Sequence, residues 1–184
     1  MIAPRHPERF KEVASLIQQS GLTWTRRTNP PDPNDTNTAV ILLDTIGELP
    51  AMYELAQIVF VGGSIVDKGG HNVLEPAAAG ATVVTGAHTH NFQAIVALMQ
   101  EAGAIVQLPP LEGAVACEEV AYVFAKLLAD PRERAELGRR AKQLVTDNQG
   151  AADRTMKLIA PLLSGTRRST SNPDPILAAN AHTS

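Results

Sequence analysis

Two short apolar runs, separated by a segment that favours a helix, place the strongest constraint on how this chain folds. The runs cover residues 39–43 and 58–61. Continuous apolar runs of this length are typical of strands that are buried on both faces of a parallel sheet. Further strands are expected at residues 22–26, 81–84 and 104–108, and helices at 7–20, 48–56, 73–79, 92–102, 117–129, 131–147 and 151–163. This alternation predicts an α/β fold with an open, Rossmann-like parallel sheet.

The pattern also predicts where this domain ends. Residues 1–163 are expected to form one domain, whereas residues 164–184 lack periodicity and are expected to be a disordered tail. Ile2 and Ala3 resemble the last residues of a strand that enters a Pro4-Arg5 turn. We therefore expect the domain to lack its first strand–helix unit.

Composition excludes several classes of function. The net charge of −3 gives no general attraction to nucleic acid, so no nucleic-acid partner is expected. Cys117 is the only cysteine, and the five histidines follow no known ligand spacing, so neither an internal disulfide nor a bound metal is expected. No apolar run reaches the roughly 20 residues that span a membrane.

Ligands of open α/β sheets bind beyond the carboxyl ends of the strands, so the loops at these ends are the candidate sites. In the first loop, Arg5 stands where it can meet a phosphate or a base carbonyl; the alternative is a solvated surface arginine. In the second loop, residues 44–48, Gly47 allows the backbone to approach a planar base closely. The alternative there is an ordinary helix cap from Thr45 or Glu48.

The third loop, residues 62–76, is the richest in candidate ligand-binding groups. Gly69 and Gly70 precede Asn72 and a helix start, so that backbone N–H groups are available to an anion. Glu75 would be repelled by phosphate, and its carboxylate suits the two hydroxyls of a ribose better. The alternative is a glycine-rich surface loop with a capping Asn72.

The fourth loop, residues 85–92, contains Asn91, which is either an N-cap or a ligand contact. His88 and His90 either approach a ligand or form a solvated pair. The chain has no GxGxxG, GxxxxGK[ST] or GxSxG motif, which argues against dinucleotide binding, ATP hydrolysis and a serine-hydrolase elbow.

Several of these segments together resemble 3-deoxy-D-manno-octulosonic acid (Kdo) transferases. The resemblance rests on APRHPERF at residues 3–10, DTIGEL at 44–49, the loop at 62–76 with its GGHNVLEP string, and Asn91-Phe92, and it runs in register from about residue 2 to 163. It implies the C-terminal, donor-binding domain of a metal-independent GT-B glycosyltransferase. Ala87 and His90 depart from the family pattern, in which a proline and an aromatic residue are usual.

The resemblance also implies a role for each site residue. The implied contacts are Pro4 and Arg5 to the cytidine end of CMP-Kdo, the backbone of Ile46, Gly47 and Glu48 to the base, Asn72, Val73 and Leu74 to the phosphate, and Glu75 to the ribose. CMP-Kdo is a donor substrate, and no cofactor is implied. No catalytic residue is expected in this chain, because the family's catalytic carboxylate lies in the acceptor domain.

For the parent enzyme, the resemblance implies transfer of Kdo to lipid A precursor in lipopolysaccharide core biosynthesis, at the cytoplasmic face of the bacterial inner membrane. We expect this chain alone to be inactive, and only the full-length enzyme to associate with the membrane. Two alternatives remain: the donor domain of another GT-B transferase that uses a UDP- or GDP-sugar, or a non-catalytic remnant. The APRHPERF string argues against an epimerase of the related two-domain fold.

Overall fold

The computed structural model describes residues 1–111 and 113–149. The chain divides into two compact units, Met1–Asp147 and Asn148–Ser184, and the fold described here is that of the first. The helix predicted at residues 151–163 and the tail predicted at 164–184 lie outside the described residues.

The strands are short and pair in parallel, as predicted. They are β1 (Trp24–Arg26), β2 (Val40–Leu42), β3 (Ile58–Val61), β4 (Thr82–Thr85) and β5 (Val106–Gln107). β1 pairs with β2, while β3, β4 and β5 form a second sheet in that order. Ile2 adds one parallel bridge to Leu42. The described residues thus contain two parallel sheets instead of one open sheet, because no ladder among them continues from Ile2 to β3.

The helices follow the predicted order. They are α1 (Phe10–Gln19), α2 (Leu49–Tyr53), α3 (Leu74–Ala79), α4 (Gln93–Glu101), α5 (Gly113–Ala129) and α6 (Pro131–Asn148), with short 3-10 helices η1 (Pro7–Arg9), η2 (Pro33–Asn37) and η3 (His90–Phe92). η2 lies in a segment for which the sequence predicts neither a helix nor a strand, and α5 begins before the predicted residue 117. Among the described residues, no helix is both long and apolar enough to cross a membrane.

Helix α1 packs on the sheet formed by β1 and β2. Ala14 and Ile17 are buried against Leu42 of β2. Leu16 of the same helix is 56% exposed. Successive helical residues are about 100° apart, so the face that presents Ala14 and Ile17 to the sheet turns Leu16 toward solvent.

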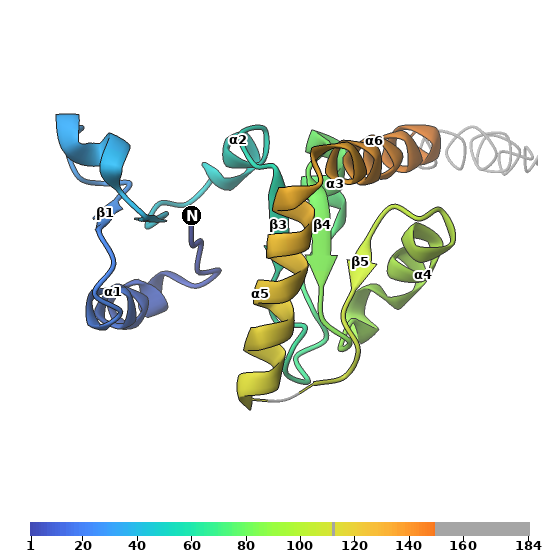
Figure 1. The fold of residues 1–184 in the computed structure, drawn as a ribbon, viewed down its shortest axis with the longest axis horizontal. Helices are drawn as coiled ribbons and strands as arrows, with labels where there is room; N and C mark the ends of the chain where they lie inside the picture. Colours follow the sequence, from blue (N-terminus) through green and yellow to red (C-terminus); the bar gives the residue numbers. More distant parts are fainter. Residues whose placement is uncertain (112, 150–184) are drawn as a thin grey trace, which may run out of the picture. The chain divides into compact units, whose positions relative to one another are not determined.

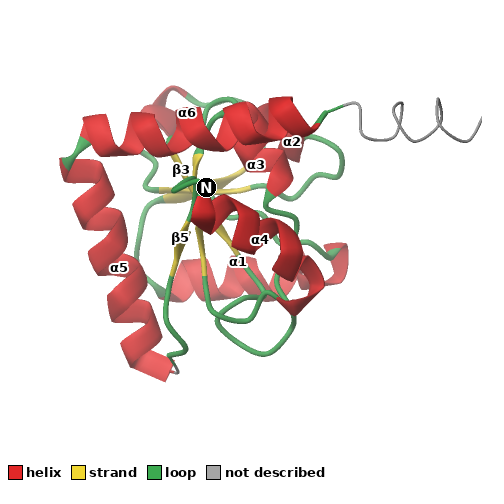
Figure 2. Cartoon of the chain, turned by 90° about the vertical axis from the view of Figure 1, so that its right-hand side faces the viewer, coloured by secondary structure: helices red, strands yellow, loops and turns green. Residues whose placement is uncertain are grey.

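Strand β4 lies at the centre of the second sheet and is buried on both faces. Val83 packs with Val96 and Met99 of α4, whereas Val84 packs with Leu127 of α5. Successive side chains of a strand point to opposite faces, so the two helices cover opposite sides of the sheet (Figure 2). The strand predicted at residues 81–84 is therefore covered on both faces, as is typical of a parallel sheet.

Helix α6 crosses the amino end of β4 (Figure 1). Thr82 Oγ1, at the start of the strand, donates a hydrogen bond of 2.7 Å to the Arg134 carbonyl of α6. Gly138 lets the helix approach the backbone closely, because a Cβ at this position would collide with the carbonyl oxygen of Gly80. Helix α6 therefore does not cover the carboxyl ends of the strands, where the candidate loops lie.

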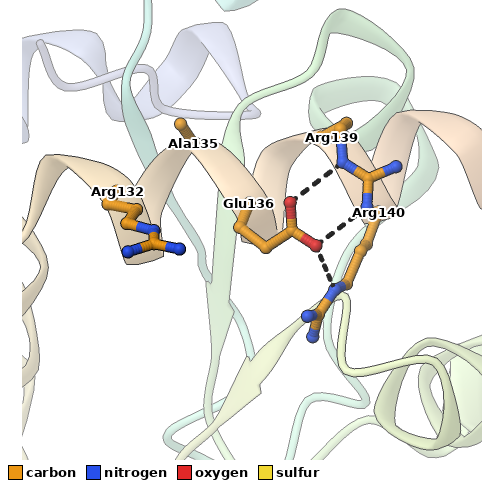
Figure 3. A pocket seen from close by; sticks show the side chains of 5 residues that line it. All are labelled: Arg132, Ala135, Glu136, Arg139 and Arg140. Atoms are coloured by element: carbon orange, nitrogen blue, oxygen red, sulfur yellow. Dashed lines mark hydrogen bonds and ion pairs between the residues drawn. The ribbon is translucent and has the colours of Figure 1, made fainter.

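The outer surface of α6 carries a shallow recess lined by Arg132, Ala135, Glu136, Arg139 and Arg140 (Figure 3). Hydrogen bonds from Arg139 and Arg140 lower the pKa of the Glu136 carboxyl to about 2. This recess belongs to the helix at the amino end of β4, whereas ligands of parallel α/β sheets bind at the carboxyl ends. It is not a candidate for the ligand site.

Candidate functional site

The glycine-rich loop after β3 is closed by its own backbone. Gly63 and Gly70 have φ values of +69° and +73°, and the Gly70 N–H donates to the Gly63 carbonyl at 2.8 Å. This region of φ favours glycine, because a Cβ is strained there. The turn brings residues 70–73 back beside the end of β3.

Ser64 ties this loop to the one after β4. The fully buried Ser64 hydroxyl donates to the Val61 carbonyl at 2.6 Å and accepts from the Gly86 N–H at 2.9 Å. The Ser64 carbonyl also accepts from the His88 N–H at 2.9 Å. Two strand-end loops, each predicted as a candidate site, are thus fixed to one another.

Asn72 and Glu75 are joined at the beginning of α3. Asn72 Oδ1 accepts from the Leu74 N–H at 2.9 Å, and Asn72 Nδ2 donates to Glu75 Oε1 at 2.9 Å. Glu75 is exposed and Val73 is buried. A phosphate at this position would therefore compete with Asn72 for the Leu74 N–H, whereas the Val73 N–H has no hydrogen bond within the described residues.

Arg5 reaches this loop from the other sheet. Its Nη1 lies 2.8 Å from Nδ1 of His71, the residue that precedes Asn72. Burial, followed by the positive charges of Arg5 and His6, lowers the pKa of His71 below its ordinary value. The sequence predicted Arg5 and Asn72 as separate contacts, and the structure brings them to the same loop.

Hydrogen bonds to Asp44 and Glu48 fix the loop after β2. Asp44 accepts hydrogen bonds from the Thr28 N–H at 3.1 Å and the Thr28 hydroxyl at 2.8 Å. Glu48 accepts from Thr45 Oγ1 at 2.6 Å and from Arg27 Nη2 at 3.1 Å. α2 has no side-chain cap, so the alternative in which Thr45 or Glu48 caps this helix is wrong.

The braced loop presents Ile46 and Gly47 to solvent. Ile46 is 70% exposed, and Gly47 has a φ of +89°. An exposed apolar side chain beside a bare backbone suits a planar ring, which needs one surface for packing and polar groups at its edge. Within the described part of the chain, no hydrogen bond joins this segment directly to Asn72 or Glu75.

Comparisons with known proteins identify relatives of this chain. No family model matches the chain. It is 39% identical over 163 residues to the 3-deoxy-D-manno-octulosonic acid transferase of Haemophilus influenzae, covering 89% of this chain and 37% of that protein. The corresponding protein of Bordetella pertussis is 35% identical over 156 residues, or 85% of this chain and 35% of that protein.

A solved structure shares the fold as well as the sequence. It is the C-terminal CMP-Kdo binding domain of WaaA from Acinetobacter baumannii, with a TM-score of 0.68 and 35% identity over 77% of this chain and 70% of that domain. This chain belongs to the Kdo transferase family. It spans little more than a third of the length of the two curated relatives.

The fourth loop contacts the third loop instead of capping a helix. Asn91 donates through its N–H to the Gly69 carbonyl at 3.1 Å and through Nδ2 to the Lys68 carbonyl at 3.2 Å. Neither η3 nor α4 has a side-chain cap, so the N-cap interpretation of Asn91 is wrong. His88 and His90 both face Asp67, with Nδ1 to Oδ1 distances of 3.7 and 3.4 Å.

Two residues near the predicted contacts were missed from the sequence. One is His71, the partner of Arg5. The other is the half-buried Tyr53 at the end of α2, whose pKa is raised by burial and then by the charge of Glu75. α2 packs against α3 and so brings the phenol near that carboxylate. Within the described residues, no group of three His, Cys, Asp or Glu side chains is arranged to hold a metal ion.

Proposed function

We propose that this chain binds CMP-Kdo as the donor domain of a Kdo transferase. The observation that carries the proposal is the grouping of Arg5, Asn72 and Glu75 around the loop after β3, in a fold shared with a CMP-Kdo binding domain. Arginine and backbone N–H groups suit a phosphate, and a carboxylate suits a pair of hydroxyls. These are the groups that a nucleoside monophosphate presents.

Each part of CMP is assigned to one segment. The phosphate lies against Arg5, Asn72 and the N–H groups of Val73 and Leu74. The Leu74 N–H exchanges its hydrogen bond to Asn72 Oδ1 for one to the phosphate. The ribose hydroxyls donate to Glu75. The cytosine packs at Pro4 and at the Ile46–Gly47–Glu48 backbone, where a main-chain carbonyl accepts from its N4 amino group. Uracil carries a carbonyl oxygen where cytosine has the N4 amino group, so this acceptor would face the main-chain carbonyl, which is also an acceptor.

This chain contributes donor binding and stabilisation of the leaving group. When a hydroxyl of lipid A precursor displaces CMP at the anomeric carbon of Kdo, the CMP phosphate gains negative charge. Arg5 and the N–H groups of the third loop would stabilise that charge as it develops. The full-length relatives are almost three times as long as the aligned segment, and we assign acceptor binding and the general base to the rest of such a protein.

We also propose that the full-length enzyme works at the cytoplasmic face of the bacterial inner membrane, in lipopolysaccharide core synthesis. Fluorescence microscopy of the tagged full-length enzyme tests that location, and uniform fluorescence throughout the cytosol would contradict it. Because we assign the general base to another part of such a protein, we expect residues 1–184 alone not to transfer Kdo from CMP-Kdo to lipid A precursor. Turnover by the purified chain in that assay would show that the base lies within it.

Isothermal titration with CMP, UDP and GDP tests the choice of nucleotide. We expect CMP to bind at least about tenfold more tightly than UDP, a difference of about 1.4 kcal/mol. CMP at 100 times its dissociation constant should also stabilise the fold by about 2.7 kcal/mol. Tighter binding of UDP or GDP would favour the donor domain of another GT-B transferase, and no binding of any of the three would favour a non-catalytic remnant.

A further inference from the structure

The contact between Arg5 and His71 specifies the protonation of the histidine. A guanidinium has five N–H donors and no acceptor, and it stays protonated in proteins. The 2.8 Å distance from Arg5 Nη1 therefore makes Nδ1 of His71 the acceptor. Nδ1 carries the lone pair, and the proton of the neutral ring lies on Nε2.

The imidazole is held from its other edge by the glycine turn. A Cβ built on Gly63 would lie 3.2 Å from Nε2 and 3.4 Å from Cε1 of His71, so the ring packs directly on the Gly63 backbone. Gly63 itself is fixed by the hydrogen bond from Gly70. Arg5 is exposed and His71 is half-buried. The half-buried, braced ring thus orients a long side chain that would otherwise sample many rotamers.

The charges around the ring keep it neutral. Arg5 and His6, both from the turn after Ile2, are the charged or titratable groups that act on His71, and the Gly63 backbone on its other edge carries no charge. Both groups add to burial in lowering its pKa. The acceptor is therefore fully present above about pH 6.5, the ordinary histidine value, and is lost as pH falls through the lowered value.

We propose that His71 is a positioning residue that holds the Arg5 guanidinium over the glycine-rich loop, so that its remaining N–H groups face a nucleotide phosphate. Asn72, which follows His71, begins the segment assigned to that phosphate. A single neutral acceptor thereby connects the turn after Ile2 with the loop after β3. This inference rests on the proposed function.

Titration of CMP into the full chain, as wild type, His71→Leu, His71→Asn and Arg5→Met, tests it. At pH 8, His71→Leu should weaken CMP binding about tenfold, and His71→Asn should stay within about threefold of wild type because its amide oxygen can replace Nδ1 as the acceptor. In an Arg5→Met background, His71→Leu should have almost no further effect, since the two residues act through one contact.

The pH profile separates positioning from packing. The phosphate of CMP itself titrates near pH 6, so the decisive quantity is the ratio of wild-type to His71→Asn affinity at pH 8 and at a pH below the pKa of His71, which an NMR titration of the ring measures. The ratio should fall in acid, because only the wild type loses its acceptor. A purely structural role would leave it constant.

The outcomes are distinguishable. If wild type does not bind CMP, the proposed function fails and the positioning role fails with it. If wild type binds and both His71 variants bind equally well, the positioning role alone is wrong. If circular dichroism shows that His71→Leu does not fold, the ratio of wild-type to His71→Asn affinity for CMP decides. A ratio that stays constant in acid overturns the proposal, and a ratio that falls supports it.

Discussion

Replacing Gly86 by alanine should lower the free energy of unfolding by about 3 kcal/mol. Gly86 follows β4 directly, and a Cβ there would lie 2.8 Å from the Ile65 nitrogen and closer still to the Ser64 carbonyl group. These are backbone atoms, which cannot rotate away as a flexible side chain does. Overpacking of this kind typically costs about 1–3 kcal/mol.

The same change also threatens a buried hydrogen bond. Relief of the clash requires Gly86 to move away from Ser64, whose hydroxyl accepts the Gly86 N–H at 2.9 Å. A buried donor left without a partner costs about a further 1–3 kcal/mol. The loops after β3 and β4 would separate as a result, and the site would lose its shape along with the stability.

Equilibrium unfolding in urea measures the effect, with Gly62→Ala as the matched control. Gly62 lies in the same loop region, but a Cβ there meets nothing within 4 Å. The control should therefore stay within about 0.5 kcal/mol of wild type, as surface substitutions usually do. An equally small effect of Gly86→Ala would show that the two loops are not joined as described.

Replacing Glu75 by glutamine should weaken CMP binding by about 10- to 100-fold. If the ribose hydroxyls donate to this carboxylate, the variant replaces hydrogen bonds to a charged acceptor, worth about 1.5–3 kcal/mol, with weaker neutral ones. The glutamine oxygen can still accept from Asn72, as Glu75 does at 2.9 Å. The loop should therefore keep its conformation, and the loss should appear in binding and not in stability.

A ligand without the 2′-hydroxyl provides the complementary control. Wild type should prefer CMP over dCMP. This preference should shrink in Glu75→Gln, because dCMP lacks the 2′-hydroxyl donor and the variant lacks the charged acceptor of the same hydrogen bond. Glu118→Gln, an exposed carboxylate on α5, should bind CMP as wild type does. An unchanged preference for CMP over dCMP in Glu75→Gln would remove Glu75 from the ribose site.

The order and type of the elements could be predicted because each is encoded locally. The run at residues 58–61 is strand β3 without any shift of boundary, and Asp130-Pro131 marks the break between α5 and α6. Boundaries were less accurate where tertiary pairing decides them. Ala104 and Ile105 are buried but lie outside β5, because only Val106 and Gln107 pair with β4.

Long-range contacts in the site could not be predicted from local pattern. His71 appeared only as one letter of a glycine-rich string, and its partner Arg5 is 66 residues away. Asn91 has the residue type of an N-cap, yet its side chain contacts the Lys68 carbonyl in another loop. Such pairings depend on which strand ends lie together, and periodicity does not specify that.

Backbone amide NMR spectra of the chain, titrated with CMP, test most directly whether the nucleotide lies at the carboxyl ends of the strands. The account predicts saturable shifts that are largest at Ile46, Gly47 and Val73, and it predicts unchanged amides at Ala135 and Glu136 in the recess on α6. Shifts concentrated at that recess, or no saturable shift at the three site amides, would contradict it.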